Sequence, residues 1–466
     1  MGQILASLNS LLWGPVTIAL LLGSGLYLTV KFRAFHILRF GSVLQGTLGT
    51  LLRRDGNKAK GSVTPFAAVM TALAGSMGVG NIAGVATAIT LGGAGAVFWM
   101  WVSALFGMII KYAEVVLAIQ HRRTVTDRVG HEVAHLGGPM YYIEAATRGR
   151  LLPCCFAAFC VIGSFGMGNM SQSNTVAQAF ADAWRAPSWA SGLLCFAICA
   201  LIMVGGSRRI IGVSSVIIPA ISAIYMLGSA AVICVNAGAV PGVLAKIFAE
   251  AFDFRSAAVG AGTYGALAAL RFGIARGIFS NEAGIGSAPI AHACADVKNP
   301  HEQGLWGIFE VFFDTIVVCT MTALVILVSG VFAPGQAADG ITLTTAGFAG
   351  TFGALAPYFI AVAIFAYAIA TISCWALYGE RCVRYLFPRG DAPVLIYKFL
   401  FAACVFAGAL VQMRAVWDLS DIFNALMIYP NMFAVLLLMR REKDKRRGNL
   451  FMRKASPRPP EKQKNT

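Results

Sequence analysis

The stretch TPFAAVMTALAGSMGVGNIAGVATAITL, residues 64–91, decides the fold of this chain. It carries no charged residue, and a helix needs about 20 mostly apolar residues to cross a bilayer. Its middle, Gly75 to Asn81, holds three glycines and an asparagine, which are poor helix formers. In lipid, broken backbone is tolerated only where protein or a polar cavity satisfies its N–H and C=O groups. The stretch therefore predicts an interrupted membrane helix whose ends attract a carboxylate and whose carbonyls hold a cation, with a glycine-lined packing groove as the alternative.

The composition extends this reading to the whole chain. Hydrophobic residues make up 58% of the 466 and charged residues 12%, with a mean hydropathy of +0.71. A soluble domain cannot bury that much apolar surface, so we expect a polytopic membrane protein surrounded by lipid. The net charge of +16 does not indicate nucleic acid, because residues 440–466 alone hold eleven Lys and Arg. That segment is expected to be a basic cytoplasmic tail.

Apolar runs separated by polar or Gly/Pro breaks predict about eleven membrane spans. They lie near residues 11–31, 63–90, 94–119, 153–181, 189–206, 211–236, 258–293, 303–331, 352–378, 392–411 and 419–439. With the tail inside, 29 of the 37 Lys and Arg fall in the cytoplasmic loops and the tail. This alternation predicts an inner-membrane protein with a periplasmic N-terminus and a cytoplasmic C-terminus.

Ten spans remain when the first is set aside, and two successive blocks of five must face the membrane in opposite directions. This is the arithmetic of an inverted repeat. We therefore expect four parts: an extra helix with a basic loop, two five-helix repeats and the tail. Their boundaries are 1–62, 63–240, 241–439 and 440–466.

The first helix of the second block carries a matching irregularity, RFGIARGIFSNEAGIGS at residues 271–287. Charged residues and glycines share this apolar segment. Intramembrane Arg and Glu are costly and are usually paired or functional. A structural ion pair between Arg276 and Glu282 is therefore as plausible as a direct role in ligand binding.

Polar residues also mark the third and eighth of the ten helices. The third carries a stripe containing Asn169, Gln172 and Asn174, which cannot all share one face, so some are expected to pack against neighbouring helices. The eighth places Thr371 and Trp375 one turn apart on one face. Its hydroxyls suit a sodium ion and Trp375 suits a lid over a small substrate, although interhelical packing is the alternative.

The predicted cation site combines the eighth helix with the first interruption. Carbonyl groups near Gly75 and Ser76, together with the hydroxyls of Thr371 and Ser373, would form an oxygen cage suited to a hard cation. No spacing of cysteine or histidine indicates a transition-metal site in this region.

Several motifs resemble the alanine or glycine:cation symporter family, also called sodium:alanine symporters. They are GVGNIAGV at 78–85, GAVFWMW at 95–101, GGPMYYI at 137–143, RGIFSNEAG at 276–284 and YGER at 378–381. Together they are specific, and the resemblance runs from about Thr64 to Phe387.

The resemblance implies a leucine-transporter-like fold of ten core helices plus one, with Na⁺ as the coupling ion. Its substrate would be alanine, glycine or a similar small amino acid, imported by alternating access. The positions that match the family's pocket are the backbone at Gly78 and Gly80, with Asn81 beside them, and Gln172, Phe279, Thr371 and Trp375. Family members often carry Thr where Val79 stands, so this chain departs from the pattern near the pocket. The sequence does not distinguish alanine from glycine, or sodium from protons, and it gives no oligomeric state.

Two further motifs point to other classes of protein. His131, Glu132 and His135 fit H-E-x-x-H, the helical zinc motif of proteases, but Gly137 and Gly138 would end such a helix almost at once. GVGNIA at 78–83 fits a dinucleotide pattern but interrupts an apolar helix and follows no strand. We expect no enzyme, and a cation channel is the more serious alternative to a carrier.

Overall fold

The computed structural model describes residues 8–9, 11–51, 63–126, 132–253, 265–333, 340–411 and 413–441. Within these ranges the fold is helical apart from one antiparallel hairpin of β1 (Arg123–Thr126) and β2 (Glu132–Leu136). The tail expected after Arg441 lies outside the described residues, as does the second half of the basic loop, 52–62.

The helices follow one another with short connections. In the first half of the chain they are α2 (Pro15–Lys31), α3 (Phe35–Leu38), α4 (Phe40–Gly46), α5 (Leu48–Leu51), α6 (Pro65–Ser76), η1 (Gly80–Gly84), α7 (Val85–Gly92), α8 (Gly95–Gln120), α9 (Pro139–Thr147), α10 (Leu151–Phe165), η2 (Gly166–Met170), α11 (Ser171–Trp184), α12 (Ser188–Val204) and α13 (Gly206–Val235). In the second half they are η3 (Ala237–Ala239), α14 (Val240–Ala251), α15 (Ala266–Asn281), α16 (Pro289–His292), α17 (Pro300–Val311), η5 (Phe312–Cys319), α18 (Thr320–Val328), α19 (Gly340–Phe352), η6 (Gly353–Leu355), α20 (Ala356–Leu386), α21 (Ala392–Leu410) and α22 (Met413–Arg441).

Seven helical segments within the described residues are long and apolar enough to cross a membrane. They are Gly95–Gln120, Leu151–Trp184, Gly206–Val235, Pro300–Val328, Gly340–Leu386, Ala392–Leu410 and Ser420–Arg441. The bent pair Pro65–Ser76 and Gly80–Gly92 is the eighth candidate, and α2 and α12 are shorter apolar helices. A chain with this many apolar helices is a multi-pass membrane protein.

Small residues set the closest helix crossings in the core, as is usual in membrane bundles. On α15, a Cβ at Gly273 would lie 2.3 Å from the carbonyl oxygen of Ala96 on α8. One turn later, a Cβ at Gly277 would meet the hydroxyl of Ser103 on α8. Only glycine permits this approach, so α15 and α8 form one of the most extensive helix pairs of the fold.

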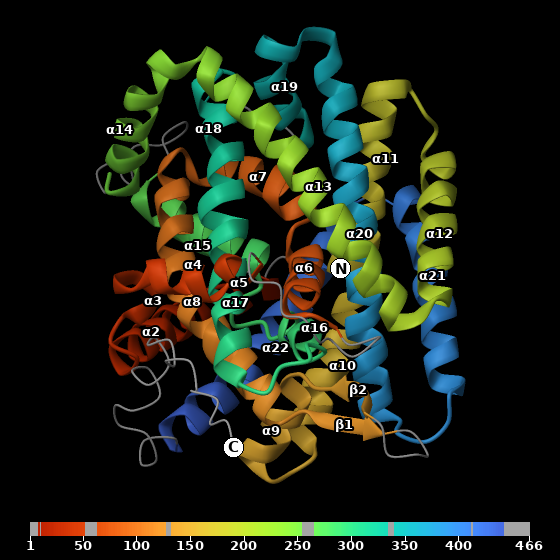
Figure 1. The fold of residues 1–466 in the computed structure, drawn as a ribbon. Coiled ribbons are helices and arrows are strands. Elements are labelled where there is room, and N and C mark those ends of the chain that lie inside the picture. The colour runs from red at the N-terminus through yellow and green to blue at the C-terminus, as the bar shows by residue number, and fades with distance from the viewer. Residues whose placement is uncertain are drawn as a thin grey trace, which may run out of the picture.

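The two ends of the molecule differ in what covers them. The hairpin and α9 lie together at the lower end in Figure 1, and α14 and α19 lie at the upper end. At the right of Figure 1, α12 and α21 run beside each other and pack together. The interrupted segments lie between these ends, where α6, η1 and α15 meet.

Candidate functional site

The first interrupted helix bends where its glycines stand. The hydroxyl of Thr64 caps α6 by accepting a hydrogen bond from the N–H of Ala67, and α6 ends at Ser76. The direction of the segment then changes by 54° between Pro65–Ser76 and Gly80–Gly92. A Cβ at Gly78 would lie 2.8 Å from Thr371 Oγ1 and 3.0 Å from Gln172 Oε1. The break therefore brings backbone next to side chains of α20 and α11 with no room for a methyl group.

Side chains of two other helices hold the opened backbone. The N–H of Val79 donates to Gln172 Oε1 at 3.3 Å, and Trp375 Nε1 donates to the carbonyl of Gly75 at 3.2 Å. Thr371 Oγ1 donates to the carbonyl of Met77 at 3.4 Å and to its own helix. The structure thus brings Gln172, Thr371 and Trp375 to the break.

The second interrupted helix completes this group. Helix α15 ends at Asn281, and the chain passes through left-handed backbone at Glu282 (φ 54°), Gly284 (φ 87°) and Gly286 (φ 91°) before α16. Phe279, in the last turn of α15, lies next to Gly80, whose Cβ would be 3.5 Å from its ring. The pocket residues expected from the resemblance therefore surround one point.

These residues are closed off from solvent. Phe279 is 3% exposed, Gln172 2%, Thr371 1% and Trp375 0%. On the upper side, the guanidinium of Arg276 lies 5.4 Å above the ring of Phe279 and pairs with Asp421 of α22 at 3.7 Å. The expected ion pair between Arg276 and Glu282 is not formed, because Glu282 lies beyond the end of α15 and accepts a hydrogen bond from Ser287 instead.

A buried carboxylate that the sequence reading missed adjoins the break. Asp314 of η5 is fully buried, and its Oδ1 accepts a hydrogen bond from Asn81 Nδ2 at 2.8 Å. Its Oδ2 accepts from the hydroxyls of Ser280 and Thr315, each at 2.8 Å. Among the described residues no Lys, Arg or His lies within 4.0 Å of it. Oxygen ligands with one negative charge suit Na⁺, and a lone acid inside an apolar span was the signal that could have revealed Asp314.

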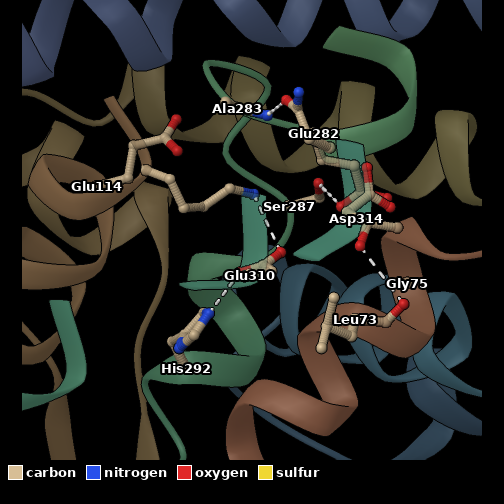
Figure 2. Close-up of polar contacts among 12 residues, drawn as sticks. Leu73, Gly75, Glu114, Glu282, Ala283, Ser287, His292, Glu310 and Asp314 are labelled. Carbon is tan, nitrogen blue, oxygen red and sulfur yellow. Dashed lines mark hydrogen bonds and ion pairs between the residues drawn. The ribbon is translucent and has the colours of Figure 1, made fainter. Parts of the chain in front are cut away.

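The cation site expected from the sequence is only partly assembled. The Gly75 carbonyl and Thr371 lie at the break, but the hydroxyl of Ser76 turns back to Leu73 at 3.4 Å. Ser373 donates to the carbonyl of Ile369 at 2.7 Å, and it stands two residues from Thr371, on a different face of α20. In Figure 2, Leu73 and Gly75 lie on one side of the Asp314 carboxylate.

The polar stripe of α11 and η2 divides between two tasks, as its spacing predicted. Asn169 Nδ2 donates to the carbonyl of Phe401, and Asn174 Nδ2 donates to that of Gly408, so both pack against α21. Gln172 alone faces the break.

The H-E-x-x-H segment does not form a protease helix. Its residues from Glu132 onward belong to strand β2, where successive side chains alternate between faces, whereas the zinc motif needs one helical turn between its histidines. His131 lies outside the described residues. Within the described part of the chain, no group of three or more His, Cys, Asp or Glu side chains is placed to hold a metal ion.

Comparison with known proteins identifies similar transporters. The model of the sodium:alanine symporter family matches residues 1–457. The sodium/alanine symporter AgcS of Methanococcus maripaludis is 39% identical over 445 residues, covering 93% of each chain. The "Probable sodium/glutamine symporter GlnT" of Bacillus subtilis is 37% identical over 432 residues, covering 92% of this chain and 87% of that one.

The fold also has solved counterparts. MhsT, in a crystal structure with L-phenylalanine, superposes with a TM-score of 0.58 at 13% identity, over 82% of this chain and 90% of that one. At this identity the likeness concerns the fold alone, which is that of leucine-transporter-like proteins.

Proposed function

The chain belongs to the sodium:alanine symporter family, which is a family of transporters and not of enzymes, and from this we propose that it imports a small neutral amino acid together with sodium. The observation that carries the proposal is the meeting of two helix breaks with Gln172, Thr371, Phe279 and Trp375 in one buried place. The preferred substrate is alanine or glycine.

The substrate carboxylate would bind at the first break. The N–H groups of Gly78 and Val79 are held by the side-chain oxygens of Asn81 and Gln172, at 3.2 and 3.3 Å. A carboxylate offers the same N–H groups a charged acceptor, and it sits at the N-terminal end of the half-helix formed by η1 and α7. Gly80 leaves room for it beside Phe279.

Sodium would bind at Asp314, next to that carboxylate. Asn81 connects the two positions, because its Oδ1 accepts from the N–H of Gly78 while its Nδ2 donates to Asp314. Turning the hydroxyls of Ser280 and Thr315 would present their oxygens to the ion. The set of Gly75, Ser76, Thr371 and Ser373 is a second candidate, favoured by the contact of Thr371 with the carbonyl of Met77.

Aromatic side chains would limit the size of the substrate. Trp375 is fixed between the carbonyl of Gly75 and Gly168, where a Cβ would lie 2.2 Å from the Trp375 side chain. Phe279 is held under Arg276 on the other side. Side chains fixed in this way exclude a bulkier substrate by overlap, since neither can move aside without breaking its contacts.

The proposed topology keeps eleven spans. It counts α2, the bent pair of α6 and α7, α8, α10 with α11, α12, α13, α15 with α16, α17 with α18, α20, α21 and α22. Setting α2 aside leaves two blocks of five, 63–240 and 241–439, each opening on an interrupted helix. The basic loops would place the hairpin and the C-terminus in the cytoplasm of a bacterial cell and the N-terminus in the periplasm.

Counterflow of labelled alanine in proteoliposomes tests the proposal. We expect labelled alanine to accumulate in vesicles preloaded with unlabelled alanine when sodium is present, and not when potassium replaces it. Uptake should saturate with alanine, which a cation channel would not show. Saturable uptake of glutamine and not of alanine would contradict the substrate and leave the sodium symport intact.

A further inference from the structure

A buried charged cluster lies between the substrate residues and the hairpin. It contains one lysine and three glutamates, all fully buried: Lys111 and Glu114 of α8, Glu282 after α15, and Glu310 of α17. Figure 2 shows Glu114, Glu282 and Glu310 on different elements around the same region. The functions proposed above use none of the four.

Glu310 takes both of the basic partners of this cluster. Lys111 Nζ lies 3.4 Å from Glu310 Oε1, and His292 Nε2 lies 2.7 Å from Glu310 Oε2. Gln303 Nε2 donates to His292 Nδ1 at 2.8 Å, so the ring proton stays on Nε2 and the imidazole is neutral. The lysine charge therefore compensates Glu310 and leaves no further cation for its neighbours.

Glu114 has hydrogen-bond donors but no counter-ion. Its Oε1 accepts from the N–H of Gly284 at 3.1 Å and from Asn431 Nδ2 at 2.5 Å, and its Oε2 is buried without a hydrogen-bond partner. No Lys, Arg or His of the described chain comes within 4.0 Å of its carboxyl group.

The surroundings of Glu114 add no other positive charge. Lys111 on its own helix and Glu310 on α17 act on it through space, Glu282 stands at the start of the adjoining loop, and Tyr142 faces it from α9. Helix α22 places Asn431 and Met432 there, and α2 places Leu21 against Gly284. A buried carboxylate with no cation of its own costs several kcal/mol, so the neutral acid is the stable form in this conformation.

The same carboxyl group ties moving parts together. Gly284 belongs to the loop that joins the two halves of the second interrupted helix, and Asn431 also donates to the carbonyl of Gly284 at 2.8 Å. Tyr142 of α9 donates to Asn431 in turn. Separation of this loop from α8 would remove both donors of Glu114 and admit water, and the carboxyl group would then ionise.

We propose that Glu114 is a proton-binding site, and that the protein must take up a proton there to close its hairpin side after releasing substrate. Glu114 stands six residues, or about 9 Å, from the end of α8 at Gln120, so this proton enters and leaves on the hairpin side. The inference rests on the proposed transport function and on the cytoplasmic placement of the hairpin.

Right-side-out membrane vesicles provide the test, because the internal pH can be varied while the external pH is held constant. We expect sodium-driven alanine uptake to fall at least about fivefold as the internal pH rises from about 6 to about 8.5, because the proton is then scarce where it is needed. Glu114→Gln, which mimics the neutral acid, should make uptake independent of internal pH. The matched control Glu302→Gln, at an exposed position of α17, should follow the unaltered protein.

A second measurement does not depend on transport. Infrared spectra of the purified protein should contain the carbonyl band of a protonated carboxyl group that disappears in Glu114→Gln and shifts in Glu114→Asp. A flat dependence on internal pH in the unaltered protein, or the same dependence in Glu114→Gln, would overturn the proposal, as would the absence of that band. Failure of all sodium-driven amino-acid uptake would instead contradict the transport function.

Discussion

Asn81 Nδ2 donates to Asp314 Oδ1 over 2.8 Å, which links the first interrupted helix to η5 across 233 positions of sequence. Through its Oδ1 the same amide holds the N–H of Gly78. One side chain therefore touches both the proposed carboxylate site and the proposed sodium site, and a bound ion and a bound substrate would stabilise each other there.

Asp314→Asn should raise the sodium concentration needed for half-maximal alanine uptake by about tenfold or more, since it removes the only charge from the proposed oxygen cage. Initial uptake rates over a sodium series would measure this. Asp391→Asn, at a position with a 90% exposed side chain, is the matched control and should leave the sodium series unchanged. Ser373→Ala separates the two candidate sites: a large effect there with none at Asp314 would move the ion to α20.

Gly78→Ala should reduce alanine uptake to about a tenth or less, because the new methyl group would overlap Thr371 Oγ1 and Gln172 Oε1. Gly84→Ala makes the same change in the same segment, where a Cβ meets no atom within 4 Å, and should transport normally. Both variants should be compared at equal amounts of folded protein in the membrane. Equal activity of the two would place the substrate away from Gly78.

Phe279→Ala should weaken alanine uptake and admit valine or leucine, because it removes the ring beside Gly80. Trp375→Ala should act in the same direction from the other side of the pocket. Added substrate bulk is then no longer rejected by overlap but discriminated by only about 1 to 3 kcal/mol. Competition of unlabelled amino acids against labelled alanine measures the change. The control Phe248→Ala, a 48% exposed side chain of α14, should keep the original rank order.

Asp421→Asn should lower alanine uptake several-fold, because it removes the carboxylate that holds Arg276 over Phe279. Lys246→Gln breaks a pair on the surface, Lys246 with Glu250 at 3.8 Å, and should stay within about twofold since exposed ion pairs contribute little. Uptake kinetics of the two variants in parallel give the comparison. Unchanged kinetics in Asp421→Asn would show that the Arg276 contact does not close the site.

A reporter fused after Arg441 should read cytoplasmic, and one placed before Leu11 should read periplasmic, since 29 of the 37 basic residues fall on the side of the tail. Two reporters in the same compartment would mean an even number of spans. That outcome would remove the inverted repeat while leaving the contacts at the two breaks as they are.

The family, the helical class and the positions of both interruptions could be predicted from the sequence. Apolar length and glycine content act locally, so residues 64–91 and 271–287 announce their breaks without knowledge of any partner. The motif around His131 could be discounted for the same reason, because the glycines that follow it forbid a long helix.

The partners of the charged side chains were decided only by tertiary structure. Arg276 and Glu282 lie six positions apart in the sequence, yet the end of α15 between them sends Arg276 to Asp421 and Glu282 to Ser287. Asp314 is a single acid in an apolar run until packing brings Asn81 and Ser280 to it. Local backbone preferences are written in neighbouring residues, whereas the pairing of buried charges depends on which helices meet, and only the folded chain determines that.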